Sequence, residues 1–143
     1  MRTVMRTFPG EEYYQQHPTI MKKVPGFIGT RYVLAVKDLS VSVAFYQSEL
    51  GFKSLWTDSG WHALRRGACT IMLGECPDEP AAAELGDHAY FAYVEVENID
   101  ALYAELGGKA VEVIRPIQDQ PWGQREFPIR TVDGHRIMFG EAV

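Results

Sequence analysis

The chain has 143 residues, of which 46% are hydrophobic and 23% are charged, and its formal net charge is −5. This length and this balance are typical of one folded domain and argue against a disordered chain. Two cysteines are too few for a disulfide scaffold or a four-thiolate zinc site, and no hydrophobic run approaches the roughly 20 residues that cross a bilayer. We therefore expect a cytoplasmic protein with no membrane contact and no secretory signal.

The acidic residues are concentrated in the middle of the chain. Between Gly67 and Gly108 there are nine Asp and Glu residues and no Lys or Arg. Such a segment repels phosphate backbones, so nucleic acid is not an expected partner. Two interpretations remain open. One is a solvated acidic surface, which is the usual explanation of a charge run, and the other is a surface that attracts a cationic ligand.

The first half of the chain predicts an arm followed by a strand, a helix and three strands. Residues 1–28 are interrupted by prolines and glycines and have no periodic pattern, so we interpret them as an N-terminal arm. Residues 32–36 are β-branched and apolar, which predicts a strand, and Asp38 is the candidate N-cap of a helix that ends near Gly51. Three further strands are predicted over residues 52–57, 61–65 and 69–73.

The second half repeats this order after residues 77–86, which have the composition of a linker. A strand is predicted over 89–96, and Asn98 is the candidate N-cap of a helix that ends at Gly107. The closing strands are predicted over residues 109–114, 125–131 and 136–139. The repeat is also visible in the letters that close each half, Ile71-Met72-Leu73-Gly74-Glu75 and Ile137-Met138-Phe139-Gly140-Glu141.

These patterns predict an α+β fold. It is built from two βαβββ modules, residues 29–76 and 87–143, which together form one domain behind the arm. Modules this short cannot close a core alone, so we expect them to pair within the chain or between chains.

Two stretches of the sequence resemble a known family. The residues that follow the first strand are Asp38-Leu39, Ser42, Phe45-Tyr46 and Leu50-Gly51-Phe52. Their spacing resembles a motif of the vicinal oxygen chelate superfamily, which includes glyoxalase I, extradiol dioxygenases and bleomycin-resistance proteins. The second stretch, Gln120-Pro121-Trp122-Gly123 followed by Arg125-Glu126-Phe127 and Asp133-Gly134, resembles the bleomycin-resistance branch. The sequence departs from that branch by an extra Gln124 and by His135 in place of Asn.

Enzymes of this superfamily hold one divalent metal with His and Glu side chains at symmetric positions of the two modules. The internal repeat aligns those positions with Arg31, Met72, Phe91 and Met138. A permanent cation, a phenyl ring and two thioethers do not suit a hard or borderline divalent metal. We therefore expect no metal, no cofactor and no catalytic residue. An enzyme of the superfamily with a non-standard site remains an alternative, and so does a regulatory or interaction module.

The resemblance implies a binding protein that sequesters a planar or cationic small molecule, such as a bleomycin-class antibiotic, in an apolar groove between cupped mixed sheets. Aromatic side chains beside such a groove stack on flat ligands. The candidate ligand-binding residues are Trp122, Phe127, Trp56, Trp61, Phe91, Tyr93, Met138 and Arg31. The resemblance also implies a homodimer that exchanges its N-terminal arms, with Tyr13, Tyr14 and Phe27 packed on the partner.

Overall fold

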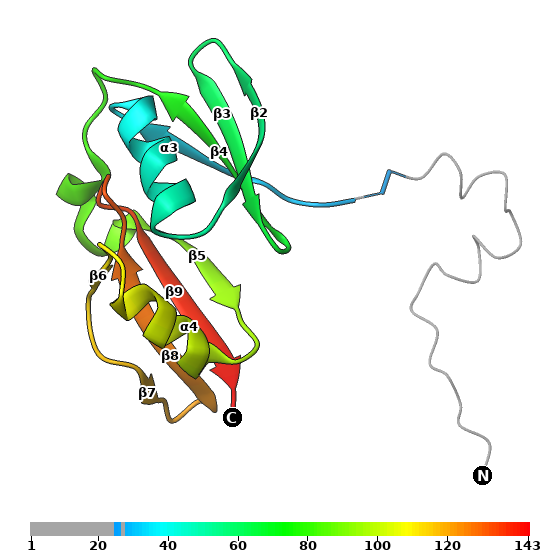
Figure 1. Ribbon diagram of the computed structural model, residues 1–143, viewed down its shortest axis with the longest axis vertical. Helices are drawn as coiled ribbons and strands as arrows, with labels where there is room; N and C mark the ends of the chain where they lie inside the picture. The colour runs from blue at the N-terminus through cyan, green and yellow to red at the C-terminus, as the bar shows by residue number, and fades with distance from the viewer. Residues whose placement is uncertain (1–24, 27) are drawn as a thin grey trace, which may run out of the picture.

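The computed structural model describes residues 25, 26 and 28–143. Figure 1 shows two modules, one above the other, each with a sheet and one helix. The first module contains β1 (Tyr32–Val36), α3 (Leu39–Ser48), β2 (Lys53–Asp58), β3 (Trp61–Arg66) and β4 (Cys69–Glu75). Its sheet has the order β1-β4-β3-β2, with β1 parallel to β4 and the other pairs antiparallel. The predicted order of strand, helix and three strands is confirmed.

The second module repeats the topology with small differences. It contains η1 (Ala82–Ala89), β5 (Tyr90–Glu95), α4 (Ile99–Gly107), β6 (Glu112–Val113), β7 (Gln118–Asp119), β8 (Gln124–Arg130) and β9 (Arg136–Ala142). The sheet order is β5-β9-β8-β6, and β7 also pairs with β8. The strand predicted over 109–114 is wrong in length, because Pro116 follows closely and a proline cannot donate to a ladder. A short 3₁₀ segment, η1, also begins within the stretch predicted to be a linker.

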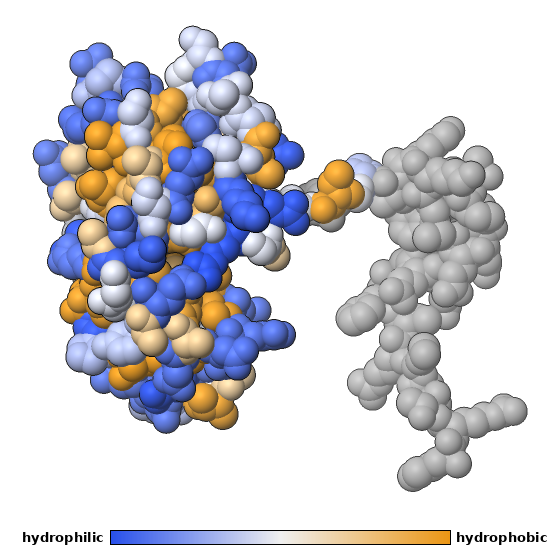
Figure 2. Space-filling view, in the orientation of Figure 1, coloured by the Kyte–Doolittle hydropathy of each residue, from blue (hydrophilic) through white to orange (hydrophobic). Residues whose placement is uncertain are grey.

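One face of each sheet packs against the helix of its module. In β1 this alternation is plain, because Leu34 and Val36 are buried whereas Val33 and Ala35 are exposed. The buried faces of both modules join in one hydrophobic core. On the side of the molecule shown in Figure 2, hydrophobic residues lie in separate groups between hydrophilic ones. We call the faces of the two sheets that point away from the helices the first and the second open face.

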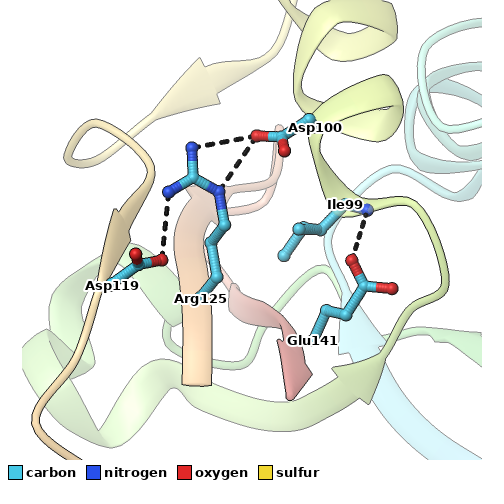
Figure 3. Close-up of polar contacts among 5 residues, drawn as sticks. All are labelled: Ile99, Asp100, Asp119, Arg125 and Glu141. Atoms are coloured by element: carbon cyan, nitrogen blue, oxygen red, sulfur yellow. Dashed lines mark hydrogen bonds and ion pairs between the residues drawn. The ribbon is translucent and has the colours of Figure 1, made fainter. Parts of the chain in front are cut away.

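The last residue of the repeated pentapeptide caps a helix in each module. The Glu141 carboxylate accepts hydrogen bonds from the backbone N–H of Asn98 at 2.9 Å and of Ile99 at 3.2 Å, the second of which is drawn in Figure 3. In the first module, Glu75 accepts from the backbone N–H of Leu39 at 2.9 Å. A carboxylate at this place satisfies free N–H groups and faces the positive end of the helix dipole.

The two predicted N-caps differ in outcome. Asp38 accepts a hydrogen bond from the backbone N–H of Val41 at 3.2 Å, which confirms the prediction. Asn98 holds the N-cap position of α4 as predicted, but it has a φ of 59° and its side chain makes no capping hydrogen bond. Glu141 supplies the cap of α4 in its place.

A branched ion pair fixes the outer strands of the second sheet to its helix. The Arg125 guanidinium on β8 contacts Asp100 of α4 at 3.0 Å and Asp119 of β7 at 3.0 Å, as Figure 3 shows. These hydrogen bonds raise the pKa of Arg125, so it stays charged. The short strand β7 is therefore held at the sheet by a side chain as well as by its pairing with β8.

The modules are joined by polar contacts as well as by the shared core. Ser42 of α3 is fully buried and lies 2.8 Å from both carboxylate oxygens of Asp133, in the turn between β8 and β9. Burial raises the pKa of Asp133 and lowers the pKa of the neighbouring His135. Arg66 of β3 also binds Glu105 of α4 at 2.8 Å. These contacts set how the two sheets lie relative to each other.

Candidate functional site

The first open face carries two tryptophans around an apolar centre, with Asp58 and Arg65 at its margins. Cross-strand pairing places Val33 beside Met72, Met72 beside Ala63, and Ala63 beside Trp56. Trp61 lies on the same face, two residues from Ala63 on β3. Trp56 and Trp61 are 39% and 40% exposed, and Val33 is 60% exposed. This face therefore offers two indole rings and an aliphatic floor to anything that covers it.

The ring of Trp61 lies over the backbone of Gly74. A Cβ atom at position 74 would meet two ring carbons of Trp61 at 2.9 Å, which is too close for an unstrained contact. Gly74 is paired with Trp61 across β3 and β4. Because glycine has no Cβ atom, the Trp61 ring can lie directly against the backbone of the sheet at this position. The Trp61 ring therefore lies against the sheet at Gly74 and leaves part of its surface exposed.

The second open face uses the same device with a different ring. A Cβ atom at Gly140 would clash with the Tyr93 hydroxyl oxygen, so Tyr93 crosses directly over this glycine. The hydroxyl then donates to Oε2 of Glu126 at 2.8 Å and lies 3.2 Å from Oε1 of Gln124. Tyr93 is 44% exposed, whereas Glu126 is 2% exposed. Gly74 and Gly140 occupy the same place in the repeated pentapeptide.

A buried ion pair lies beneath this tyrosine. Nη2 of Arg115 is 3.5 Å from Oε1 of Glu126 and 3.9 Å from the sulfur of Met138. The Glu126 side chain is 3% exposed and that of Arg115 is 34% exposed. A buried carboxylate is retained only when it is paired and hydrogen-bonded, and Arg115 and Tyr93 provide both. The second open face therefore has a buried carboxylate at its centre, whereas the centre of the first is apolar.

Three of these residues were missed by the sequence reasoning. Glu126 lay within the Arg-Glu-Phe stretch and Gly140 within the repeat, so both had a signal, but neither was assigned to the site. Arg115 had none, because it lies between β6 and β7 in a segment that the sequence predicted only in part as strand. Its contact with Glu126 joins residues 11 positions apart in the chain.

The positions that align with the family metal ligands do not come together as a donor set. Met72 and Met138 lie on different sheets, and Arg31 is exposed just before β1. Phe91 is half-buried, with its ring 5.5 Å from that of Tyr32 and 5.7 Å from that of His135. Within residues 28–143, no three His, Cys, Asp or Glu side chains form a group that could hold a metal ion. These residues do not fit a divalent metal.

The remaining predicted site residues fall into separate places. Trp122 is 64% exposed in the turn that precedes β8, away from both tryptophans of the first sheet in sequence and in strand order. Phe127 is fully buried, with its ring 5.0 Å from Tyr103 of α4 and 5.4 Å from Phe139. Phe127 therefore faces the helix and belongs to the core in this structure, so we do not assign it to ligand contact.

A cleft of about 870 Å³ lies between the two modules. Two of the predicted residues line it, Phe91 and Tyr93, together with Tyr32, Phe52 and Cys69 among others. Burial raises the pKa of the Cys69 thiol, which makes it a weak nucleophile. Residues of the edge strand β5 line one side of the cleft, and residues of the first module line the other. Trp56 and Trp61 lie outside it.

The fold and the open faces define a class of protein. Two βαβββ modules with mixed sheets form the architecture, and the profile of the Glyoxalase/Bleomycin resistance protein/Dioxygenase superfamily matches residues 30–139. The chain belongs to this superfamily. Within the described residues, no helix is long and apolar enough to cross a membrane.

Individual relatives place the chain near antibiotic-binding proteins. Bleomycin resistance proteins of Geobacillus stearothermophilus and Staphylococcus aureus are each 28% identical to it over 125 residues, which cover 77% of this chain and 93% of theirs. The crystal structure of a bleomycin-binding protein from bleomycin-producing Streptomyces verticillus, in complex with copper(II)-bleomycin, is 26% identical with a TM-score of 0.64. That match covers 81% of this chain and 97% of the Streptomyces chain.

Proposed function

We propose that this protein binds a planar aromatic small molecule on its open faces and sequesters it without chemical change, with bleomycin-class antibiotics as the first candidates. The observation that carries the proposal is that the Trp61 ring lies against Gly74, on the same face as the exposed Trp56 and Val33. A held indole ring stacks on a flat ligand and loses little conformational entropy when it does so. The similarity to bleomycin resistance and bleomycin-binding proteins supports the choice of ligand.

The ligand site in this proposal is assembled from both open faces. Trp56 and Trp61 provide the stacking surface of the first face, and Tyr93 and Met138 lie on the second. Phe91, Arg31 and Trp122 stay candidates at its margins. No residue acts as a catalyst, and no metal takes part, because Arg31, Met72, Phe91 and Met138 do not suit one.

We further propose that the protein acts as a homodimer in the cytoplasm. Both open faces are exposed in a single chain, and a second copy that brings the first face of one chain against the second face of the other would close a groove between the tryptophans of one face and the charged residues of the other. The predicted exchange of N-terminal arms through Tyr13, Tyr14 and Phe27 falls on residues outside the described part of the chain. Two free thiols, Cys69 and Cys76, agree with a reducing compartment.

Equilibrium binding and metal analysis test the proposal together. We expect a bleomycin-class antibiotic to bind the full chain saturably and to be recovered with its mass unchanged after prolonged incubation. We expect the chain to sediment as a dimer at micromolar concentration. Loss of the indole in Trp61→Ala should weaken binding by about tenfold or more, as for other single stacking contacts.

The enzyme alternative makes the opposite forecast. A metal-dependent enzyme of this superfamily would be purified without chelator with about one Ni, Zn, Fe or Mn ion per chain. Such a stoichiometry, or a mass change in the antibiotic, would overturn the binding proposal. A regulatory or interaction module would bind no antibiotic at all.

A further inference from the structure

The ring of Tyr93 is anchored at its hydroxyl end and bare on its outer side. The hydroxyl passes over Gly140, donates to Oε2 of the buried Glu126 at 2.8 Å and lies 3.2 Å from Oε1 of Gln124. Nonetheless 44% of the residue remains exposed. The contacts fix where the ring lies, and the exposure leaves it open to a ligand.

The surroundings of this ring make its face attractive to a cation. A phenol that donates a hydrogen bond to a carboxylate gains electron density on its oxygen and ring. The face of an aromatic ring already attracts cations. Desolvation, the hydrogen bond to Glu126 and the charge of Glu95 together raise the pKa of Tyr93 to about 12. The nearby cation, Arg115, is already engaged by the other Glu126 oxygen at 3.5 Å and by Met138 at 3.9 Å.

The tryptophan of the first open face has different surroundings. Trp61 lies over Gly74, Val33 and Met72 on its face are apolar, and Asp58 of β2 is its cross-strand partner. Among the described residues, no hydrogen bond ties the Trp61 indole to a carboxylate, whereas the phenol of Tyr93 donates to Glu126 at 2.8 Å. The two rings therefore favour different parts of a ligand.

We propose that Tyr93 forms a cation-binding half-site for a positively charged planar ring, such as a quinolinium, and that Glu126 is the positioning residue that orients and polarises Tyr93. The inference rests on the proposed function, because it assumes that small molecules bind at the open faces, and it adds which face takes the charge. Trp61 then stacks on the neutral part of the ligand. Arg115 lies 3.5 Å from the buried Glu126 carboxylate and balances its charge.

A matched pair of probes tests this directly. 1-Methylquinolinium and 1-methylnaphthalene have nearly the same shape and differ in charge. Ligand-observed NMR titration of the full chain should give an affinity about threefold higher for the cation, the size expected for one partly exposed cation–π contact. Glu126→Gln keeps the shape of the side chain, and it should bring the ratio of the two affinities close to one while the neutral probe binds as before.

Two further variants control the experiment. Glu79→Gln removes one negative charge from an exposed segment outside the open faces, and it should leave the ratio unchanged. Tyr93→Phe keeps the ring and removes the hydrogen bond, so it should lower the ratio as Glu126→Gln does and serves if that variant fails to fold.

The outcomes separate the inference from the proposed function. Equal affinities for both probes in the natural protein would overturn the cation half-site and leave small-molecule stacking standing. Equal loss of both probes in Glu126→Gln and in Tyr93→Phe would show a merely structural role for Glu126 and would also overturn it. Failure of both probes to bind the natural protein would overturn the proposed function itself.

Discussion

The two open faces are built on the same repeated pentapeptide and carry different chemistry. In the first module Gly74 lies beneath the exposed ring of Trp61, and in the second Gly140 lies beneath Tyr93, which is tied to the buried Glu126. In both modules the next residue, a glutamate, caps the helix. The comparison teaches that the repeat supplies a glycine under an aromatic ring and a cap for a helix. The neighbouring strands decide which ring lies over the glycine and whether that ring is hydrogen-bonded to a buried carboxylate.

The largest expected effect is on stability, and it distinguishes Gly140 from Gly74. In Gly140→Ala the new Cβ would clash with the Tyr93 hydroxyl, so the Tyr93 ring must move away and Glu126 loses a hydrogen bond. Overpacking together with an unsatisfied buried acceptor should cost about 2–4 kcal/mol of unfolding free energy. In Gly74→Ala the contact with the edge of the Trp61 ring is 2.9 Å, and this ring can lift toward solvent at a cost of about 1 kcal/mol. Urea unfolding measures the loss of unfolding free energy in both variants. Equal losses would contradict the expected difference between the two glycines.

The two glutamate caps should also differ, by a smaller amount. Glu141 accepts from two backbone N–H groups of α4, whose N-cap residue Asn98 offers no side-chain bond. Glu75 accepts from one N–H of α3, which also has the cap of Asp38. We expect Glu141→Ala to cost about 1–2 kcal/mol and Glu75→Ala less than about 1 kcal/mol. Thermal unfolding of the two variants tests this, and a greater loss in Glu75→Ala would show that the modules are capped in another way.

The smallest effect appears only at high pH. Desolvation and the hydrogen bond to Glu126 raise the pKa of Tyr93 from 10.0 to about 12. Between these values the folded chain keeps the proton that the unfolded chain releases, so stability falls as the pH rises through this window. Tyr93→Phe should show a shallower fall, because the other tyrosines titrate alike in both proteins. Unfolding curves at about pH 9 and about pH 11.5 provide the measurement, and parallel falls would contradict the assignment.

The sequence was sufficient for the architecture because its signals were local and repeated. The strand, helix and strand pattern, the cap of Asp38 and the pentapeptide at the end of each module each depend on residues close in the chain. The cap of α4 was not predictable in this way. Asn98 has the residue type of a cap but adopts a φ of 59°, and the carboxylate that replaces it comes from Glu141, 43 residues later.

The candidate site was predictable only in part, because the sheet face on which a side chain lies depends on contacts with residues distant in the sequence. Phe127 was placed with the ligand-binding aromatics, yet it faces Tyr103 and the core. Phe127 and its neighbours Glu126, Pro128 and Ile129 are all buried, so hydrophobic alternation on β8 does not tell which residue faces the helix. Glu126 is buried on the open face because Tyr93 and Arg115, from other parts of the sheet, cover and pair it.

Calorimetric titration of the full chain with copper(II)-bleomycin, beside Trp61→Ala and Leu85→Ala, tests the central claim most directly. Leu85 is 49% exposed in η1, outside the open faces, and serves as the matched apolar control. The account predicts saturable binding near one ligand per chain, weakened by about tenfold or more in Trp61→Ala and unchanged in Leu85→Ala. Absence of saturable binding, or equal affinity in both variants, would contradict it.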